Sequence, residues 1–323
     1  MGYIKKVWVD DITPVSATNL NNIENGISVV DTHMTAIASA SVLGHIKVGT
    51  GINVAAGVIS VPAAAPPVVL APLTIYVDKL GSNSNTGLSA GASGAFLTIQ
   101  AAVNKAKTLI CSEITISIAP GTYVENLDMQ FIANKVIMTS STFTKTDVTI
   151  TGYINGNNSL FIRIMNLTMN GTLYGFMATL RIGRAEFYNV VMLNMTVNPI
   201  TIKRASSVII QNCTLSHASI GTTVDLAQVG CVFIENGTLT GGYAIQLENV
   251  GSARFENVTL VVTVNPGNAG INLTSGTTAS MANMKGTLGA YPVAKVSGSV
   301  LMKGVNTITG AADIKSGGGQ IFV

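Results

Sequence analysis

The chain has few charged residues, which make up only 10% of its 323 positions. Apolar residues account for 47% and glycine for 33 positions, which excludes a disordered chain, because disorder requires low hydrophobicity and high charge. The formal net charge is +3, from 18 basic and 15 acidic residues, and the basic residues form no cluster along the sequence. Nucleic-acid binding therefore has little support, and we expect no nucleic-acid partner.

Cysteine and histidine are also scarce, with three of each. Cys111, Cys213 and Cys231 are far apart and include no CxxC or CxC pair. This spacing predicts buried thiols rather than a disulfide framework or a zinc site. We accordingly expect no metal, no cofactor and folding in a reducing cytoplasm.

No apolar stretch is both long and uninterrupted. The uncharged segment 48–77 contains four prolines and several glycines, which argue against a membrane-spanning helix. The apolar run within residues 1–11 is too short for the core of a signal peptide. The sequence thus predicts neither membrane insertion nor secretion by this route.

What the sequence does contain is a degenerate repeat with a period of about 23 residues. Its phrases read FIRIMNLTM, AEFYNVVML, VIIQNCTL, VFIENGTL and ARFENVTL. They centre on Asn166, Asn189, Asn212, Asn236 and Asn257, at spacings of 23, 23, 24 and 21. A near-fixed period with strand-like content indicates one supersecondary unit stacked many times.

Each phrase alternates apolar and polar residues, and the phase of the alternation shifts by one position at the Asn. Ile164 and Phe187 belong to the inward column before the corner, and Cys213 to a column after it. Asn tolerates left-handed backbone, so the shift predicts a sharp corner. Two strands meeting at a repeated corner predict the rungs of a parallel β-helix, about 4.8 Å apart. A β-sandwich is the alternative, although its strands need not repeat one phrase at a near-fixed period. The poorer phrase MANMKGTL, at 281–288, is typical of a terminal rung or a bulged coil.

The N-terminal part has a different, heptad spacing. The seam consists of Leu20, Ile23, Ile27, Val30, Met34 and Ile37. It predicts a coiled coil over 18–38, and β-branched residues at the d positions favour three or more strands, hence a homotrimer. An amphipathic helix packed on its own domain is the alternative.

Three segments follow from these patterns. Residues 1–61 are expected to form a trimerisation region, whose part 44–61 alternates small apolar and polar residues and predicts short strands. The Pro/Ala-rich stretch 62–72 is a stiff linker. Residues 73–323 form the all-β solenoid.

The opening WVDDITPVSATNLNNIENGI and the segment GHIKVGTGINVAAGVISV resemble N-terminal attachment regions of bacteriophage tail-fibre, baseplate and related virion-appendage proteins. The stretch 74–107, which includes FLTIQAA, resembles the capping helix and first rung of pectate-lyase-like β-helix proteins, and IAPGTYVENL resembles their first coil. The resemblance implies a bacteriophage appendage with a right-handed β-helix. It does not imply lyase activity, because the Asp and Lys/Arg sets of those lyases are absent from the sequence.

Catalytic candidates are few. Glu235 and Glu256 are placed outward, one residue before the Asn on successive rungs, where a polysaccharide hydrolase could use two carboxylates. Glu248, Asp225 and Arg254 are expected nearby, the first two in turns. The simpler interpretation is two solvated carboxylates on an exposed face.

Two other features concern the outward surface. Arg163 and Glu186 occupy equivalent positions on adjacent rungs and predict a cross-rung ion pair. Six tyrosines along the solenoid suit either sugar stacking or coverage of turns and a trimer interface: Tyr123, Tyr153, Tyr174, Tyr188, Tyr243 and Tyr291.

The sequence therefore predicts a homotrimeric virion appendage, such as a tail fibre, spike or head fibre. It would be assembled in the host cytoplasm, attach by its N-terminus to a tail, baseplate or capsid protein, and bind a host cell-surface glycan or envelope component. A polysaccharide depolymerase on the same scaffold, and a purely structural connector, are the alternatives.

Overall fold

The computed structural model describes residues 16–35, 53–55, 58–60, 71–171, 173–218, 221–262 and 269–323. The chain divides into two compact units, Met1–Val68 and Val69–Val323.

The first unit contains one helix and one hairpin among its described residues. Helix α1 (Ala17–Thr35) carries the predicted seam, except Ile37, which lies outside the described residues. Leu20, Ile23 and Ile27 are 50%, 38% and 60% exposed, so this chain alone does not cover them. Strands β1 (Asn53–Ala55) and β2 (Val58–Ser60) lie within the segment 44–61 and pair antiparallel.

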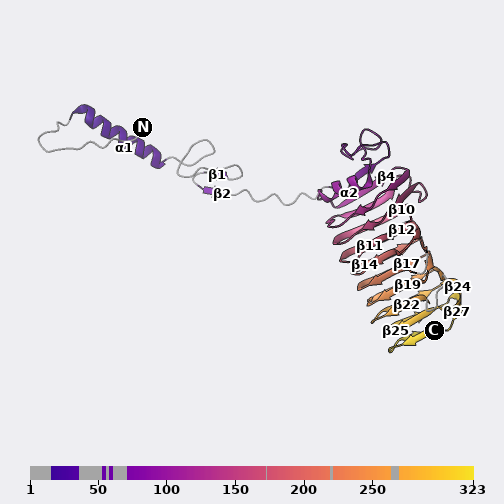
Figure 1. Cartoon of the computed structure of the whole chain (residues 1–323). Coiled ribbons are helices and arrows are strands. Elements are labelled where there is room, and N and C mark those ends of the chain that lie inside the picture. The colour runs from indigo at the N-terminus through magenta and orange to yellow at the C-terminus, as the bar shows by residue number, and fades with distance from the viewer. Residues whose placement is uncertain are drawn as a thin grey trace. The chain divides into compact units, whose positions relative to one another are not determined.

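The second unit is a parallel β-solenoid, and its strands stack along one axis (Figure 1). The repeat therefore predicted the architecture correctly, and the sandwich alternative was wrong. The first strand of the solenoid, β3, begins at Leu73. Each rung contributes strands to three faces, which we call A, B and C.

Face A precedes the Asn corner. Its strands are β3 (Leu73–Val77), β4 (Glu113–Ile118), β7 (Lys135–Ser140), the first part of β10 (Ser159–Asn170) and of β12 (Ile182–Met195), β14 (Ala205–Gln211), β17 (Val229–Glu235), β20 (Ser252–Glu256), β23 (Thr278–Ala282), β26 (Val300–Lys303) and β29 (Gln320–Phe322). Neighbouring strands pair in parallel in this order.

Face B follows the Asn corner. Its strands are β5 (Gly121–Val124), β8 (Val148–Thr151), the second part of β10 and of β12, β15 (Thr214–His217), β18 (Thr238–Gly241), β21 (Thr259–Val262), β24 (Lys285–Pro292) and β27 (Thr307–Ala311).

Face C is a nine-stranded sheet of short strands. They are β6 (Leu127–Asp128), β9 (Ile154–Asn155), β11 (Tyr174–Ala178), β13 (Asn198–Ile202), β16 (Thr222–Ala227), β19 (Tyr243–Glu248), β22 (Ala269–Thr274), β25 (Ala294–Ser297) and β28 (Ile314–Ser316).

The corner between faces A and B is formed by the repeated Asn, as predicted. The residues there have positive φ angles of 51° to 55°: Asn166, Asn189, Asn212, Asn236, Asn257 and Asn283. Asn adopts this left-handed conformation at lower cost than most residues because its short amide can hydrogen-bond locally.

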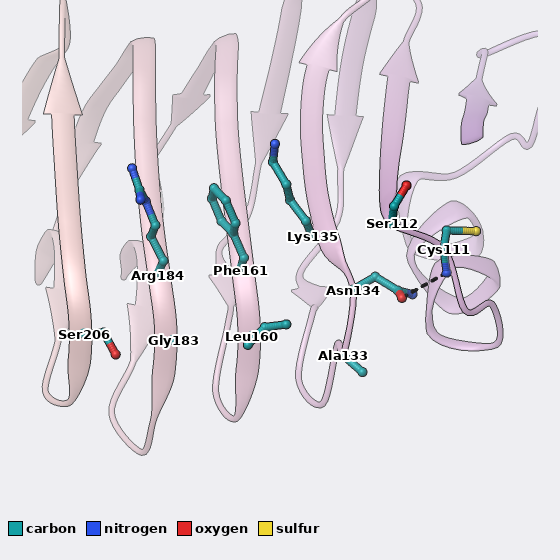
Figure 2. A pocket seen from close by; sticks show the side chains of 10 residues that line it. All are labelled: Cys111, Ser112, Ala133, Asn134, Lys135, Leu160, Phe161, Gly183, Arg184 and Ser206. Carbon is teal, nitrogen blue, oxygen red and sulfur yellow. Dashed lines mark hydrogen bonds between the residues drawn. The ribbon is translucent and has the colours of Figure 1, made fainter. Parts of the chain in front are cut away.

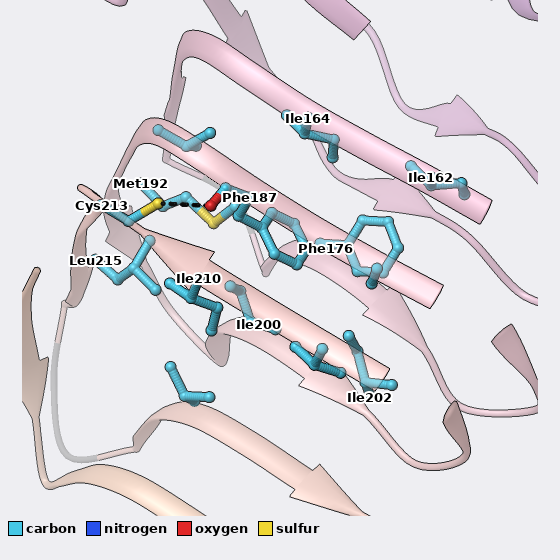
Figure 3. Close-up of a cluster of buried hydrophobic side chains, with 14 of the residues drawn as sticks. Ile162, Ile164, Phe176, Phe187, Met192, Ile200, Ile202, Ile210, Cys213 and Leu215 are labelled. Carbon is cyan, nitrogen blue, oxygen red and sulfur yellow. Dashed lines mark hydrogen bonds between the residues drawn. The ribbon is translucent and has the colours of Figure 1, made fainter. Parts of the chain in front are cut away.

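The interior is filled by aliphatic and aromatic columns. Phe176 and Phe187 meet edge to face, with ring centroids 5.2 Å apart, and Met192 and Cys213 lie beside them (Figure 3). Complete burial of one large apolar side chain, such as Phe or Met, stabilises the fold by about 1.5–3 kcal/mol. Cys213 is 1% exposed, which confirms its predicted inward column.

Helix α2 (Ile99–Lys107) covers the first rungs, as the resemblance implied. Its N-cap is Thr98, whose side chain accepts a hydrogen bond from Ala101 N. The carboxylate of Glu125 accepts hydrogen bonds from Ile99 N and Gln100 N at 3.0 and 2.9 Å, which fixes the helix to the following coil.

The phrase at 281–288 belongs to a bulged coil rather than a terminal rung. The pairing of β24 with β27 shifts register between Thr287 and Pro292, and later strands continue the stack. The C-terminal segment ends in β28, a turn and β29.

Candidate functional site

The predicted carboxylate pair lies where the repeat placed it. Glu235 and Glu256 are register partners on β17 and β20, at the end of face A. Each carboxylate accepts a hydrogen bond from a different side chain. Gln211 Nε2 donates to Glu235 Oε2 at 2.6 Å, and Arg254 Nη2 donates to Glu256 Oε2 at 2.6 Å. The two carboxylates thus share a surface. Their catalytic role stays a prediction.

The residues expected beside this pair belong to other elements. Asp225 lies within β16 and Glu248 ends β19, so both are on face C rather than in turns. Asp225 accepts hydrogen bonds of 2.7 Å from Lys203 Nζ through both carboxylate oxygens. The turn assignment was wrong because the repeat phrase does not extend to face C.

Two other predictions about surface residues need correction. Tyr123 is fully buried, its hydroxyl donates to Ala119 O at 3.0 Å, and burial raises its pKa to about 12. It therefore cannot stack on a sugar. Cys231 is exposed on face A, whereas Cys111 and Cys213 are buried as expected.

A groove of about 410 Å³ crosses the starts of several face A strands (Figure 2). It is lined by Cys111, Ser112, Ala133, Asn134, Lys135, Leu160, Phe161, Gly183, Arg184 and Ser206. At one end, Asn134 Oδ1 accepts a hydrogen bond from Cys111 N at 3.2 Å, which holds the coil between α2 and β4.

Three cations surround one aromatic ring beside this groove. Lys135, Phe161 and Arg184 are register partners on β7, β10 and β12, so they stand side by side (Figure 2). Lys135 Nζ lies 5.3 Å from the Phe161 ring centroid, and the Arg163 and Arg184 guanidinium carbons lie at 5.6 and 5.4 Å. These cation–π contacts hold the three long side chains in place.

The predicted pair of Arg163 and Glu186 is confirmed, and a second arginine joins it. Arg163 Nε donates to Glu186 Oε2 at 2.5 Å. Arg184 Nε lies 2.5 Å from Glu186 Oε1, but Oε1 receives no hydrogen bond, so this contact is an ion pair only. Glu186 is fully buried beneath the arginines. Burial of Tyr188, followed by the negative charge of Glu186, raises the pKa of the tyrosine hydroxyl.

The cluster has an excess of positive charge. Lys135 forms an ion pair with Glu113, and both arginines share Glu186. Three cations and two carboxylates leave one net positive charge. The side chain of Arg184 is 45% exposed, so it can reach a ligand. The groove is therefore suited to a carboxylate or phosphate group, which a guanidinium binds through charge-assisted hydrogen bonds.

This cluster was not predicted from the sequence. Lys135 lies upstream of the first phrase, and Phe161 and Arg184 lie five residues before their Asn, outside the compared positions. Extending the alignment of the rungs in both directions would have placed the three in one column.

The described part of the chain contains no group of three or more His, Cys, Asp or Glu side chains that could hold a metal ion. Nor does any helix there have the length and apolar character needed to span a membrane.

Comparisons with known proteins identify no family for this chain. No protein-family model matches the sequence, and no curated protein matches it. A solved structure described as a rhamnogalacturonan lyase is similar, with a TM-score of 0.46 and 10% identity over 78% of this chain and 87% of that one. The likeness is too distant to indicate activity.

Proposed function

We propose that this chain is a host-binding appendage of a bacteriophage particle, whose solenoid binds an anionic glycan of the cell surface. The N-terminal unit would attach the protein to the particle and join three copies. The solenoid would present the groove of face A to the host.

The observation that carries this proposal is the preorganised cation cluster at the groove. Arg184 is exposed, while Phe161 and Glu186 hold its guanidinium in place. A binding site built from side chains that are already ordered loses little conformational entropy when ligand binds. Anionic groups are frequent on bacterial surface glycans, so the chemistry of the groove fits such a partner.

The N-terminal unit supports the proposed assembly of three copies. The apolar side chains Leu20, Ile23 and Ile27 stand exposed on α1 and follow heptad spacing. Covering them with copies of the same helix would bring three grooves together. Weak sites on one rigid assembly then gain avidity for a surface that presents many ligands.

The binding proposal is tested with Arg184→Gln and Lys135→Gln in the full chain. Each change removes one cation, and we expect at least about tenfold weaker binding of oligogalacturonate or poly(glycerol phosphate) in calorimetry, from the loss of a charge-assisted contact. Arg254→Gln is the matched control, because Arg254 is an exposed face A arginine outside the groove. Equal affinities for all four proteins would overturn the assignment of the groove.

The depolymerase alternative depends on the register pairing of Glu235 and Glu256. If they act as a hydrolytic pair, Glu235→Gln and Glu256→Gln each abolish release of reducing ends from a cleaved polysaccharide. Unchanged release in both variants would remove the pair from consideration.

A further inference from the structure

The corner between faces C and A carries a polar, exposed residue on each of six successive rungs. These residues are Asn158, Arg181, Arg204, Gln228, Asn249 and Ser275. Backbone hydrogen bonds between adjacent rungs hold these residues in register. Ile182 N donates to Arg204 O at 2.9 Å, and Gln228 N donates to Glu248 O at 2.9 Å. Polar side chains therefore follow one another at the rung spacing of about 4.8 Å.

Four hollows along this corner share lining residues. The groove of Figure 2 shares Leu160 and Gly183 with a second hollow of about 460 Å³. Arg181 links the second hollow to one of about 240 Å³. Arg204 and Gln228 link that one to a last hollow of about 320 Å³. Together the four form one trough parallel to the solenoid axis.

The charged residues lining the trough are almost all basic. Lys135 and Arg184 line the groove, Arg181 the next hollow, and Lys203 and Arg204 the far end. Glu248, at the far end, is the acidic lining residue of the four hollows. Lys135, Arg184 and Lys203 form ion pairs with Glu113, Glu186 and Asp225. Among the described residues no ion pair involves Arg181 or Arg204, so these two arginines carry most of the uncompensated positive charge of the trough.

We infer that the trough binds a linear polyanionic chain, such as a uronate glycan or a phosphodiester-linked polymer, which lies along the solenoid axis. This inference rests on the proposed function and extends it from one anionic group to a polymer. From the rung of Asn134 to that of Ser275, the trough spans roughly 30 Å at the rung spacing. An extended sugar unit has a length similar to one rung, so about six units fill the trough.

The experiment measures affinity against chain length with the full-length protein. The probes are oligogalacturonates of graded length, from two units to about ten, with glycerol-phosphate oligomers as the second anionic series and maltooligosaccharides as the neutral series. We expect affinity to rise with length in an anionic series, level off near six units, and stay far lower for neutral chains. The stronger anionic series identifies whether carboxylates or phosphodiesters are preferred.

Variants at the far end give a second readout. Arg204→Gln should weaken binding of long anionic chains about tenfold and leave the shortest unchanged, because a dimer in the groove of Figure 2 does not reach Arg204. Arg254→Gln, outside the trough, should change neither, and thermal unfolding of each variant checks that the solenoid is intact.

The outcomes separate the two proposals. Affinity that is constant from dimers upward, or an Arg204→Gln effect equal for short and long chains, would overturn the trough and leave binding at the groove. Neutral chains binding as well as anionic ones would overturn the polyanion assignment. An absence of binding to every series would overturn the proposed function together with the trough.

Discussion

At the scale of single residues, the repeated Asn has two roles. It adopts the left-handed conformation at the A–B corner, and at Asn166 and Asn189 its amide also links neighbouring rungs. Asn189 Nδ2 donates to Asn166 Oδ1 at 2.9 Å, and Asn166 Nδ2 donates to Thr139 Oγ1 at 3.3 Å. At these two rungs the amide thus makes a hydrogen bond that Gly could not make.

The two roles can be separated at Asn189. Asn189→Ala should lower the free energy of unfolding by about 2 kcal/mol, because Ala pays for the left-handed backbone and loses the hydrogen bond. Asn189→Gly loses the hydrogen bond but accommodates the backbone, so it should be less destabilised. Urea unfolding measures both, and an Ala variant as stable as the Gly variant would show that the corner carries little strain.

The buried thiol of Cys213 should make the free energy of unfolding of the solenoid depend on pH in the alkaline range. Burial raises the thiol pKa from 9.0 to about 12. Below pH 9 the native and unfolded thiols both hold their proton, and the full stability is present. Between pH 9 and about 12 only the unfolded thiol loses its proton, so stability falls by up to about 1.4 kcal/mol per pH unit. Cys213→Ala should show a shallower loss in urea titrations over that range, and parallel curves would contradict this prediction.

At the scale of elements, the proposed trimer depends on the apolar seam of α1. Changing both Ile23 and Ile27 to Gln retains helix propensity but removes apolar surface from the seam. We expect the full chain to have a mass near three times 33.4 kDa in light scattering, and the double variant to dissociate toward the single-chain mass. Trp8→Phe, outside the seam, serves as the control. A native chain that is already monomeric would exclude the homotrimer.

Elements were predictable wherever the phrase recurs. Strands β10, β12, β14, β17 and β20 end near or pass through the Asn corner, and the alternation identified their inward residues. The strands of face C were not predicted, because they are short and their sequences carry no shared phrase. The error with Asp225 and Glu248 follows from that difference.

At the scale of the whole molecule, the proposed trimer and the trough predict a difference between surface and solution binding. The full chain should bind a surface coated with anionic polymer roughly a hundredfold more tightly than the double variant of α1, because three sites act together. Both proteins should bind a short soluble oligomer equally. An equal loss in both assays would mean that α1 affects the site itself rather than its number.

The sequence by itself determined the period, the corner residue and the inward columns, because stacking repeats the same local environment at each rung. It also placed Glu235 beside Glu256 and Arg163 beside Glu186. Only the tertiary structure decided that Glu186 is buried between two arginines, that Tyr123 lies inside, and that the hollows join along one corner. These features depend on side chains from different faces and rungs. Their proximity is set by the pitch and bend of each coil, which the local pattern of apolar and polar residues does not determine.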